Sequence, residues 1–101
     1  MLTTAHHLGE ALNGYNQQTH PVQQRILGTL ETMCGLDLSG APRSTDGCSV
    51  PAWAIPLSNL AYAFARLGAP DDLPPGRADA ALRLRKAIAA QTLMAGDKDR
   101  Y

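Results

Sequence analysis

Hydrophobic residues recur at helical spacing near the start of the chain and predict a first helix over residues 2–12. Thr3 or Thr4 could cap its beginning, and Gly14 is placed to end it. The apolar positions that carry this pattern are Leu2, Ala5, Leu8 and Leu12. The polar stretch 13–19 that follows is expected to form a loop.

A second helix is predicted to begin at His20-Pro21-Val22-Gln23, because proline favours the first position of a helix. Gln23 could reach back to the N–H of the capping residue, and Gly35 follows as the stop. Its predicted buried face consists of Val22, Ile26, Leu30 and Met33. Its predicted outer face consists of Gln23, Gln24, Arg25, Thr29 and Glu31.

Pro56 opens a third predicted helix, which Gly68 ends. Its hydrophobic residues predict a buried stripe, made of Leu57, Leu60, Ala61, Phe64 and Leu67. Only Ser58, Asn59 and Arg66 are polar along this helix, so most of its surface must be covered. The rest of the chain is too small to supply that cover.

A linker over residues 69–76 separates the third helix from a fourth, which is predicted over residues 77–94. Ala81, Leu84 and Ile88 share one face of the fourth helix. The tail over residues 96–101 has no apolar period and is expected to fray.

Residues 36–55 have no helical period, because two glycines and two prolines interrupt them. One short extended piece is expected within residues 49–55. The predicted fold class is therefore mostly α, with four helices around an irregular loop that contains Asp46-Gly47-Cys48.

The composition indicates a small domain with a thin core. The chain has 101 residues, of which 45% are hydrophobic, but 16 residues are alanine and only five are valine or isoleucine. Alanine buries little apolar surface, so the chain should be only marginally stable on its own. We expect a dimer, or a further part of the domain outside these residues.

Charge and targeting signals argue against several roles. Nine basic and nine acidic residues cancel, so no global field attracts nucleic acid or an anionic membrane surface. No apolar stretch approaches the ~20 residues that span a bilayer, and the N-terminus lacks the features of a signal peptide. We therefore expect a cytoplasmic protein with no nucleic-acid or membrane partner. Cys34 and Cys48 do not indicate a disulfide framework.

The segment Asp46-Gly47-Cys48 places a carboxylate and a thiol two residues apart, around a glycine that permits a positive-φ backbone. Pro51 then fixes the exit from the loop. This arrangement predicts a loop that directs both side chains to one place. Two plainer interpretations stay open, because Asp-Gly is a common turn signal and a lone cysteine is usually core packing.

Two other groupings could hold a metal ion. His6 and Glu10 lie four positions apart on the first predicted helix and could present two ligands on one face. Cys48 could combine with Cys34 or His20 if the fold brought them together. The competing interpretation is a solvated helix face for His6 and Glu10, and a core position for Cys34.

The segment from Asp46 to Ala61 resembles D-G-C-x-x-P-x-x-A-x-P-L-x-x-L-A of the asparaginase II family, the L-asparaginases of the rhizobial type. Upstream, Tyr15 and His20-Pro21-Val22-Gln23 resemble the Y-x(4)-H-P-x-Q stretch of that family. Residues 1–9 are similar to the segment that follows the family motif C-S-G-K-H. The resemblance covers about residues 1–95.

The resemblance implies a serine β-lactamase-like α/β enzyme, of which residues 1–101 would be a single partial domain. It also implies hydrolysis of L-asparagine to L-aspartate and ammonia, with a serine as nucleophile and a lysine as base. Neither C-S-G-K-H nor that catalytic pair lies in these residues, and Met1 stands where the family has an internal methionine. We therefore expect no catalytic residue within this chain.

The resemblance further implies that Cys48 is a zinc ligand, with a cysteine and a lysine of C-S-G-K-H completing the site outside this chain. Asp46 would then lie against the substrate or orient the site. We interpret His20, Pro21 and Gln23 as structural, since they already form a helix start.

Two hypotheses follow. The first is an interior piece of a cytoplasmic, homodimeric L-asparaginase that is inactive alone. The alternative is a small helical interaction module that binds itself or an asparaginase-like partner through an exposed stripe on the third helix.

Overall fold

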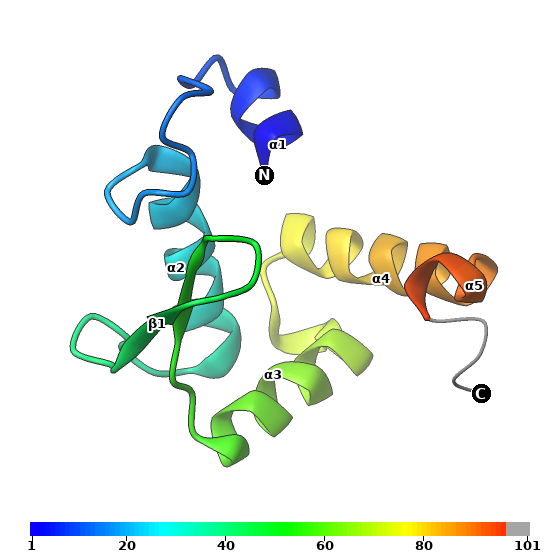
Figure 1. Cartoon of the computed structure of the whole chain (residues 1–101). Coiled ribbons are helices and arrows are strands. Elements are labelled where there is room, and N and C mark those ends of the chain that lie inside the picture. The colour runs from blue at the N-terminus through cyan, green and yellow to red at the C-terminus, as the bar shows by residue number, and fades with distance from the viewer. Residues whose placement is uncertain (97–101) are drawn as a thin grey trace. The chain divides into compact units, whose positions relative to one another are not determined.

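A computed structural model describes residues 1–96 and is mostly helical, which confirms the coarse prediction of the fold class (Figure 1). The elements in chain order are α1 Leu2–His7, α2 Pro21–Cys34, β1 Arg43–Thr45, β2 Pro51–Trp53, α3 Leu57–Gly68, the 3₁₀ turn η1 Pro70–Asp72, α4 Pro75–Ala90 and α5 Thr92–Ala95. The tail after Gly96, which was expected to fray, lies outside the described residues.

The chain divides into two compact units, Met1–Leu60 and Ala61–Tyr101. In the first unit, α1 packs on α2, and β1 and β2 form a two-stranded sheet. In the second unit, α4 packs on η1 and α5. No helix within residues 1–96 is long and apolar enough to cross a membrane. A single domain over residues 1–101 stays a prediction, as does the β-lactamase-like architecture.

Helix α1 is shorter than predicted. It ends at His7 because Gly9, with φ +69°, takes the left-handed conformation that closes a helix. The Gly9 N–H donates to the His6 carbonyl at 3.1 Å, and the Glu10 N–H donates to the Ala5 carbonyl at 2.9 Å. Glu10 therefore lies beyond the helix, and the predicted pairing of His6 and Glu10 on one helical face is wrong.

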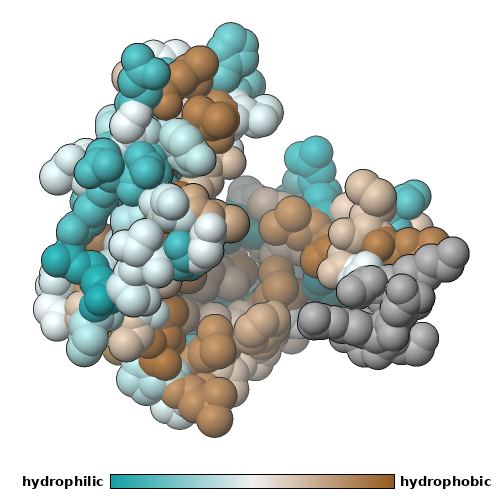
Figure 2. All heavy atoms as spheres, in the orientation of Figure 1, coloured by the Kyte–Doolittle hydropathy of each residue, from teal (hydrophilic) through white to brown (hydrophobic). Residues whose placement is uncertain are grey.

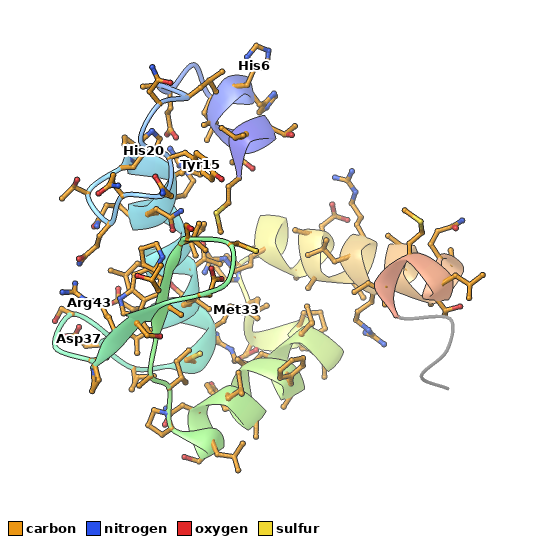
Figure 3. All side chains as sticks on the ribbon, viewed as in Figure 1. His6, Tyr15, His20, Met33, Asp37 and Arg43 are labelled. Carbon is orange, nitrogen blue, oxygen red and sulfur yellow. The ribbon has the colours of Figure 1, made fainter. Side chains whose placement is uncertain are left out.

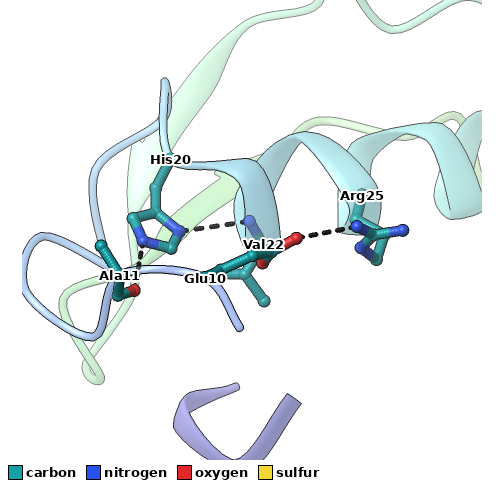
Figure 4. Close-up of polar contacts among 5 residues, drawn as sticks. All are labelled: Glu10, Ala11, His20, Val22 and Arg25. Carbon is teal, nitrogen blue, oxygen red and sulfur yellow. Dashed lines mark hydrogen bonds and ion pairs between the residues drawn. The ribbon is translucent and has the colours of Figure 1, made fainter. Parts of the chain in front are cut away.

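Helix α2 begins where the sequence predicts, with His20 as its N-cap and Pro21 in its first turn. The His20 Nδ1 accepts a hydrogen bond from the Val22 N–H at 3.1 Å, and its Nε2 lies 2.7 Å from the Ala11 carbonyl oxygen (Figure 4). A carbonyl only accepts, so these partners require a neutral ring with its proton on Nε2. His20 thus ties the start of α2 to the preceding loop.

Gln23 was placed on the outer face of α2, and that prediction is wrong. Its side chain is 1% exposed, and its Nε2 donates to the Tyr15 carbonyl at 2.8 Å and to the Met1 Sδ at 3.2 Å. It does not reach back to the cap, because the His20 N–H already donates to the Gln17 carbonyl at 2.9 Å. Gln23 is thus a second anchor of the loop before α2.

The first unit has a small core, as the composition predicts. Its buried hydrophobic residues are Ala5, Val22, Cys34, Leu38 and Val50. Two side chains at the edge of this core form hydrogen bonds with the backbone. Glu31 Oε1 accepts from the Leu38 N–H at 2.9 Å, and Asn59 Nδ2 donates to the Cys34 carbonyl at 3.0 Å. At its rim, Arg25 Nη2 and Glu10 Oε1 form an ion pair at 2.7 Å (Figure 4).

Helix α3 runs between Pro56 and Gly68 as predicted, but its apolar stripe is not buried. Leu57 is 80% exposed and Phe64 is 66% exposed. Figure 2 shows hydrophobic surface where α3 lies. The half-buried side of the helix carries Asn59, Ala63, Arg66 and Leu67. Asn59 Nδ2 donates to the Cys34 carbonyl, so the first turn of α3 is bound to the first unit through a polar residue.

Polar contacts also organise the second unit. Arg66 Nε forms an ion pair with Asp72 Oδ2 at 3.0 Å, and its guanidinium lies 5.2 Å from the centre of the Tyr62 ring. Arg85 Nη1 donates to the Gly68 carbonyl at 2.6 Å and so satisfies the end of α3. The predicted fourth helix is divided at Gln91 into α4 and α5.

We predict that Gln23→Ala lowers the free energy of unfolding by about 2 kcal/mol, because it empties a buried position and leaves the Tyr15 carbonyl without its donor. Gln24 is the matched control, since its Nε2 also donates to a loop carbonyl, that of Gln18, but in an exposed position. Gln24→Ala should cost less than about 0.5 kcal/mol. Urea unfolding followed by circular dichroism measures both, and equal losses would contradict a special role for Gln23.

Candidate functional site

The Asp46-Gly47-Cys48 segment forms the tip of a β-hairpin. Strands β1 and β2 pair antiparallel, with Arg43 opposite Trp53, Ser44 opposite Ala52 and Thr45 opposite Pro51. The prediction of a short extended piece within residues 49–55 is confirmed by β2, whereas β1 was missed. The hairpin therefore fixes a segment that the sequence pattern described as irregular loop.

A three-residue turn closes this hairpin. The Asp46 N–H donates to the Val50 carbonyl, and the Ser49 N–H donates to the Asp46 carbonyl, both at 3.0 Å. Turns of this kind place their last residue in the left-handed region, where glycine is favoured. Ser49, with φ +63°, occupies that position here. The expectation that Gly47 supplies a positive φ is wrong, because the positive-φ glycines in the described residues are Gly9, Gly14 and Gly35.

The Asp46 carboxylate holds the backbone of the turn in place. Its Oδ1 accepts hydrogen bonds from the Cys48 N–H at 2.8 Å and from the Val50 N–H at 3.1 Å. An aspartate that binds the amide two residues ahead forms an Asx turn, which stabilises a local reversal of the chain. Asp46 thus fixes the backbone that carries the Cys48 thiol.

The two cysteines lie in opposite environments. Cys48 is exposed at the hairpin tip, whereas Cys34 is 1% exposed and belongs to the core, as predicted. His20 has partners on both ring nitrogens. An ion bound by Cys48 could therefore use His20 only after breaking the cap of α2, and Cys34 only after opening the core.

Residues 1–96 do not build a zinc site by themselves. Zinc in proteins takes three or four ligands from cysteine, histidine and carboxylate groups. Within residues 1–96, no group of three or more such side chains converges on one point. Cys48 supplies one exposed thiol, so a complete zinc site at the hairpin would require ligands from outside this set.

A polar hollow of about 210 Å³ lies beside the hairpin, and the sequence pattern did not reveal it. Its polar lining comes from two segments, and consists of Asn16, Gln18, Arg43, Ser44, Thr45 and Ser49. One feature of the sequence could have indicated β1. An Asp-Gly turn that is followed by an extended run is typical of a hairpin, so a second strand is expected just before the turn. A prediction of β1 would have placed Arg43 opposite Trp53 in the hairpin. It would not have placed Arg43 beside Asn16, which comes from another segment.

The comparisons with known proteins identify one family. The family model described as L-asparaginase II matches residues 1–101, the whole length of the chain. No curated protein matches the chain. The matched range includes the hairpin with Asp46 and Cys48 as well as the start of α2 at His20.

We predict that Asp46→Ala speeds hydrogen exchange of the Cys48 and Val50 amides about tenfold, because both lose an acceptor worth about 1 to 2 kcal/mol. Asp46→Asn is the matched variant, since an asparagine retains Oδ1 as an acceptor in an Asx turn. It should exchange at nearly the wild-type rate. Exchange is measured residue by residue by nuclear magnetic resonance, and equal acceleration in both variants would refute the contact as the cause.

Proposed function

The chain belongs to the L-asparaginase II family, and we propose that it forms a helical part of an enzyme that hydrolyses L-asparagine to L-aspartate and ammonia. The observation that carries this proposal is the family match over residues 1–101. We extend the proposal to a cytoplasmic, homodimeric enzyme with a β-lactamase-like architecture. Its substrate is a side-chain amide, so the reaction is an acyl transfer to water.

Within that enzyme, Cys48 is proposed as one zinc ligand and Asp46 as the residue that orients it. Support comes from the hairpin geometry, in which Asp46 Oδ1 binds the Cys48 N–H at 2.8 Å and the thiol is exposed. The remaining zinc ligands are proposed to lie outside these 101 residues. A contact of Asp46 with substrate belongs to the same proposal, because its Oδ2 forms no hydrogen bond with any residue in the range 1–96.

The chain alone is proposed to be inactive. The serine and lysine that the family resemblance implies as nucleophile and base are assigned to no residue of this sequence. Without a nucleophile and its base, no acyl-enzyme forms at the substrate amide. Asp46 and Cys48 would contribute only to binding and orientation.

We predict that the purified 101-residue chain releases no more ammonia from L-asparagine than its Cys48→Ala variant does. A coupled assay for ammonia measures both, with a buffer blank for spontaneous hydrolysis. Release above the buffer blank by either protein would contradict the proposed inactivity, because it would locate catalysis within these residues.

A complementary experiment tests the longer protein and starts from the source DNA. The proposal expects an in-frame Cys-Ser-Gly-Lys-His immediately upstream of the Met1 codon, and a polypeptide extended through the upstream reading frame should release ammonia. In that extended protein, Cys48→Ala should reduce the release. A stop codon directly upstream of Met1 would instead favour the second candidate function.

The second candidate is a helical interaction module, and the exposed stripe on α3 favours it. Leu57 and Phe64 lie seven residues apart on one face of the helix, with 80% and 66% of their surfaces exposed. Leu60, on the same face, is 38% exposed. Contiguous exposed apolar surface of this kind is typical of a contact with another protein.

This alternative predicts that the chain associates at high concentration and that Leu57→Ser with Phe64→Ser keeps it monomeric. Leu93→Ser with Met94→Ser is the control, because these side chains are equally apolar and exposed but lie on α5. The control should associate like the wild type. Sedimentation velocity measures the mass, and a wild-type monomer at every concentration would eliminate the module.

A further inference from the structure

The polar hollow beside the hairpin is separate from the Asp46 and Cys48 side chains, neither of which lines it. One wall is β1 with Ser49, and the other wall is the loop before α2, at Asn16 and Gln18. These segments are far apart in the sequence, so the fold assembles the hollow. Pro51 is the one apolar residue that residues 1–96 contribute to its lining.

Arg43 supplies a positive charge to the hollow (Figure 3). Within the part of the chain that the structure describes, its guanidinium forms no ion pair, whereas Arg25 pairs with Glu10 and Arg66 with Asp72. Among residues 1–96, no acidic residue lines the hollow, and Asp46 uses its Oδ1 to bind the amides of the turn. A guanidinium with no acidic neighbour in its pocket is a natural partner for an oxyanion, which it binds with two parallel hydrogen bonds.

Hydroxyl and amide groups complete the lining. Ser44, Thr45 and Ser49 each bring a hydroxyl that can donate or accept, and Asn16 and Gln18 bring amides that do both. None of these side chains has a hydrogen-bond partner among residues 1–96. The hollow therefore combines one cation with five neutral polar groups, a set that suits a small, charged and strongly hydrogen-bonding molecule.

Ser49 adds an argument from backbone strain. Its φ of +63° lies in the left-handed region, where an L-residue is less stable than glycine. A serine at this position forgoes that stability, and the group it adds is a hydroxyl on the wall of the hollow. Use of this hydroxyl in binding would account for the residue.

We propose that the hollow binds a small oxyanion, a carboxylate or a phosphate, on a molecule of about amino-acid size. Pockets for drug-sized ligands enclose about 300–1,000 Å³. The 210 Å³ found here suits a smaller molecule. Arg43 pairs with the oxyanion, and the hydroxyl and amide groups bind its other polar atoms. This binding site goes beyond the proposed amide hydrolysis and does not depend on it.

The test titrates the 101-residue chain with sodium acetate, L-aspartate and inorganic phosphate, and follows backbone amides by nuclear magnetic resonance. We expect saturable shifts at the amides of Arg43, Ser44 and Thr45 with at least one of these probes. The tighter-binding class identifies the oxyanion as carboxylate or phosphate. No saturable shift at these amides with any probe, up to millimolar concentrations, would overturn the proposal.

Two variants and one control locate the binding. Arg43→Gln should weaken it about tenfold or more, as expected for loss of a charge-assisted pair. Ser49→Gly should weaken it severalfold while raising the stability of the hairpin, which excludes misfolding as the cause. Arg83→Gln removes the same charge from α4, in the other unit, and should leave binding unchanged. Equal weakening by Arg43→Gln and Arg83→Gln would show only a general charge effect and would overturn the site.

Discussion

The structure depends on hydrogen bonds from buried side chains to backbone carbonyls at the start of α2. An alanine-rich chain of this size buries too little apolar surface to hold its loops by packing alone. His20 and Gln23 compensate, because they bind the carbonyls of Ala11 and Tyr15 and so fix the loop that joins α1 to α2. The same loop carries Asn16 and Gln18, which line the hollow beside the hairpin, so these two contacts help to position them.

Hydrogen bonds from side chains to the backbone also occur elsewhere in the chain. Glu31 binds the Leu38 N–H, Asn59 binds the Cys34 carbonyl, and Arg85 binds the Gly68 carbonyl at the end of α3. The contacts of Glu31 and Asn59 are part-buried and satisfy backbone groups that water reaches less easily, whereas that of Arg85 is exposed. In α3 the residue that makes such a bond is the polar Asn59, whereas Leu57 and Phe64 are exposed.

These contacts also explain which predictions from the sequence succeeded. Gly35, with φ +65°, and Pro21 act through local backbone conformation, so their positions alone marked the end and the start of α2 correctly. Gly68 is the last residue of α3, also as predicted. Gln23 was misplaced because its partner, the Tyr15 carbonyl, lies outside any helical period. Asp46 and Cys48 lie two positions apart, so the sequence alone could assign them to one turn, and their proposed roles stay predictions. The hollow at Arg43 needs segments that only the fold brings together.

Asp46 and Cys48 have different roles in the hairpin. Asp46 uses one oxygen to hold the amides of Cys48 and Val50, so the turn does not need the thiol for its own stability. The thiol is exposed at the tip, where a second segment or a second molecule can reach it. A residue that binds a metal ion together with residues of another segment needs a fixed backbone and an accessible side chain. Asp46 meets the first requirement and the hairpin tip meets the second, so the local geometry supports the proposal for Cys48.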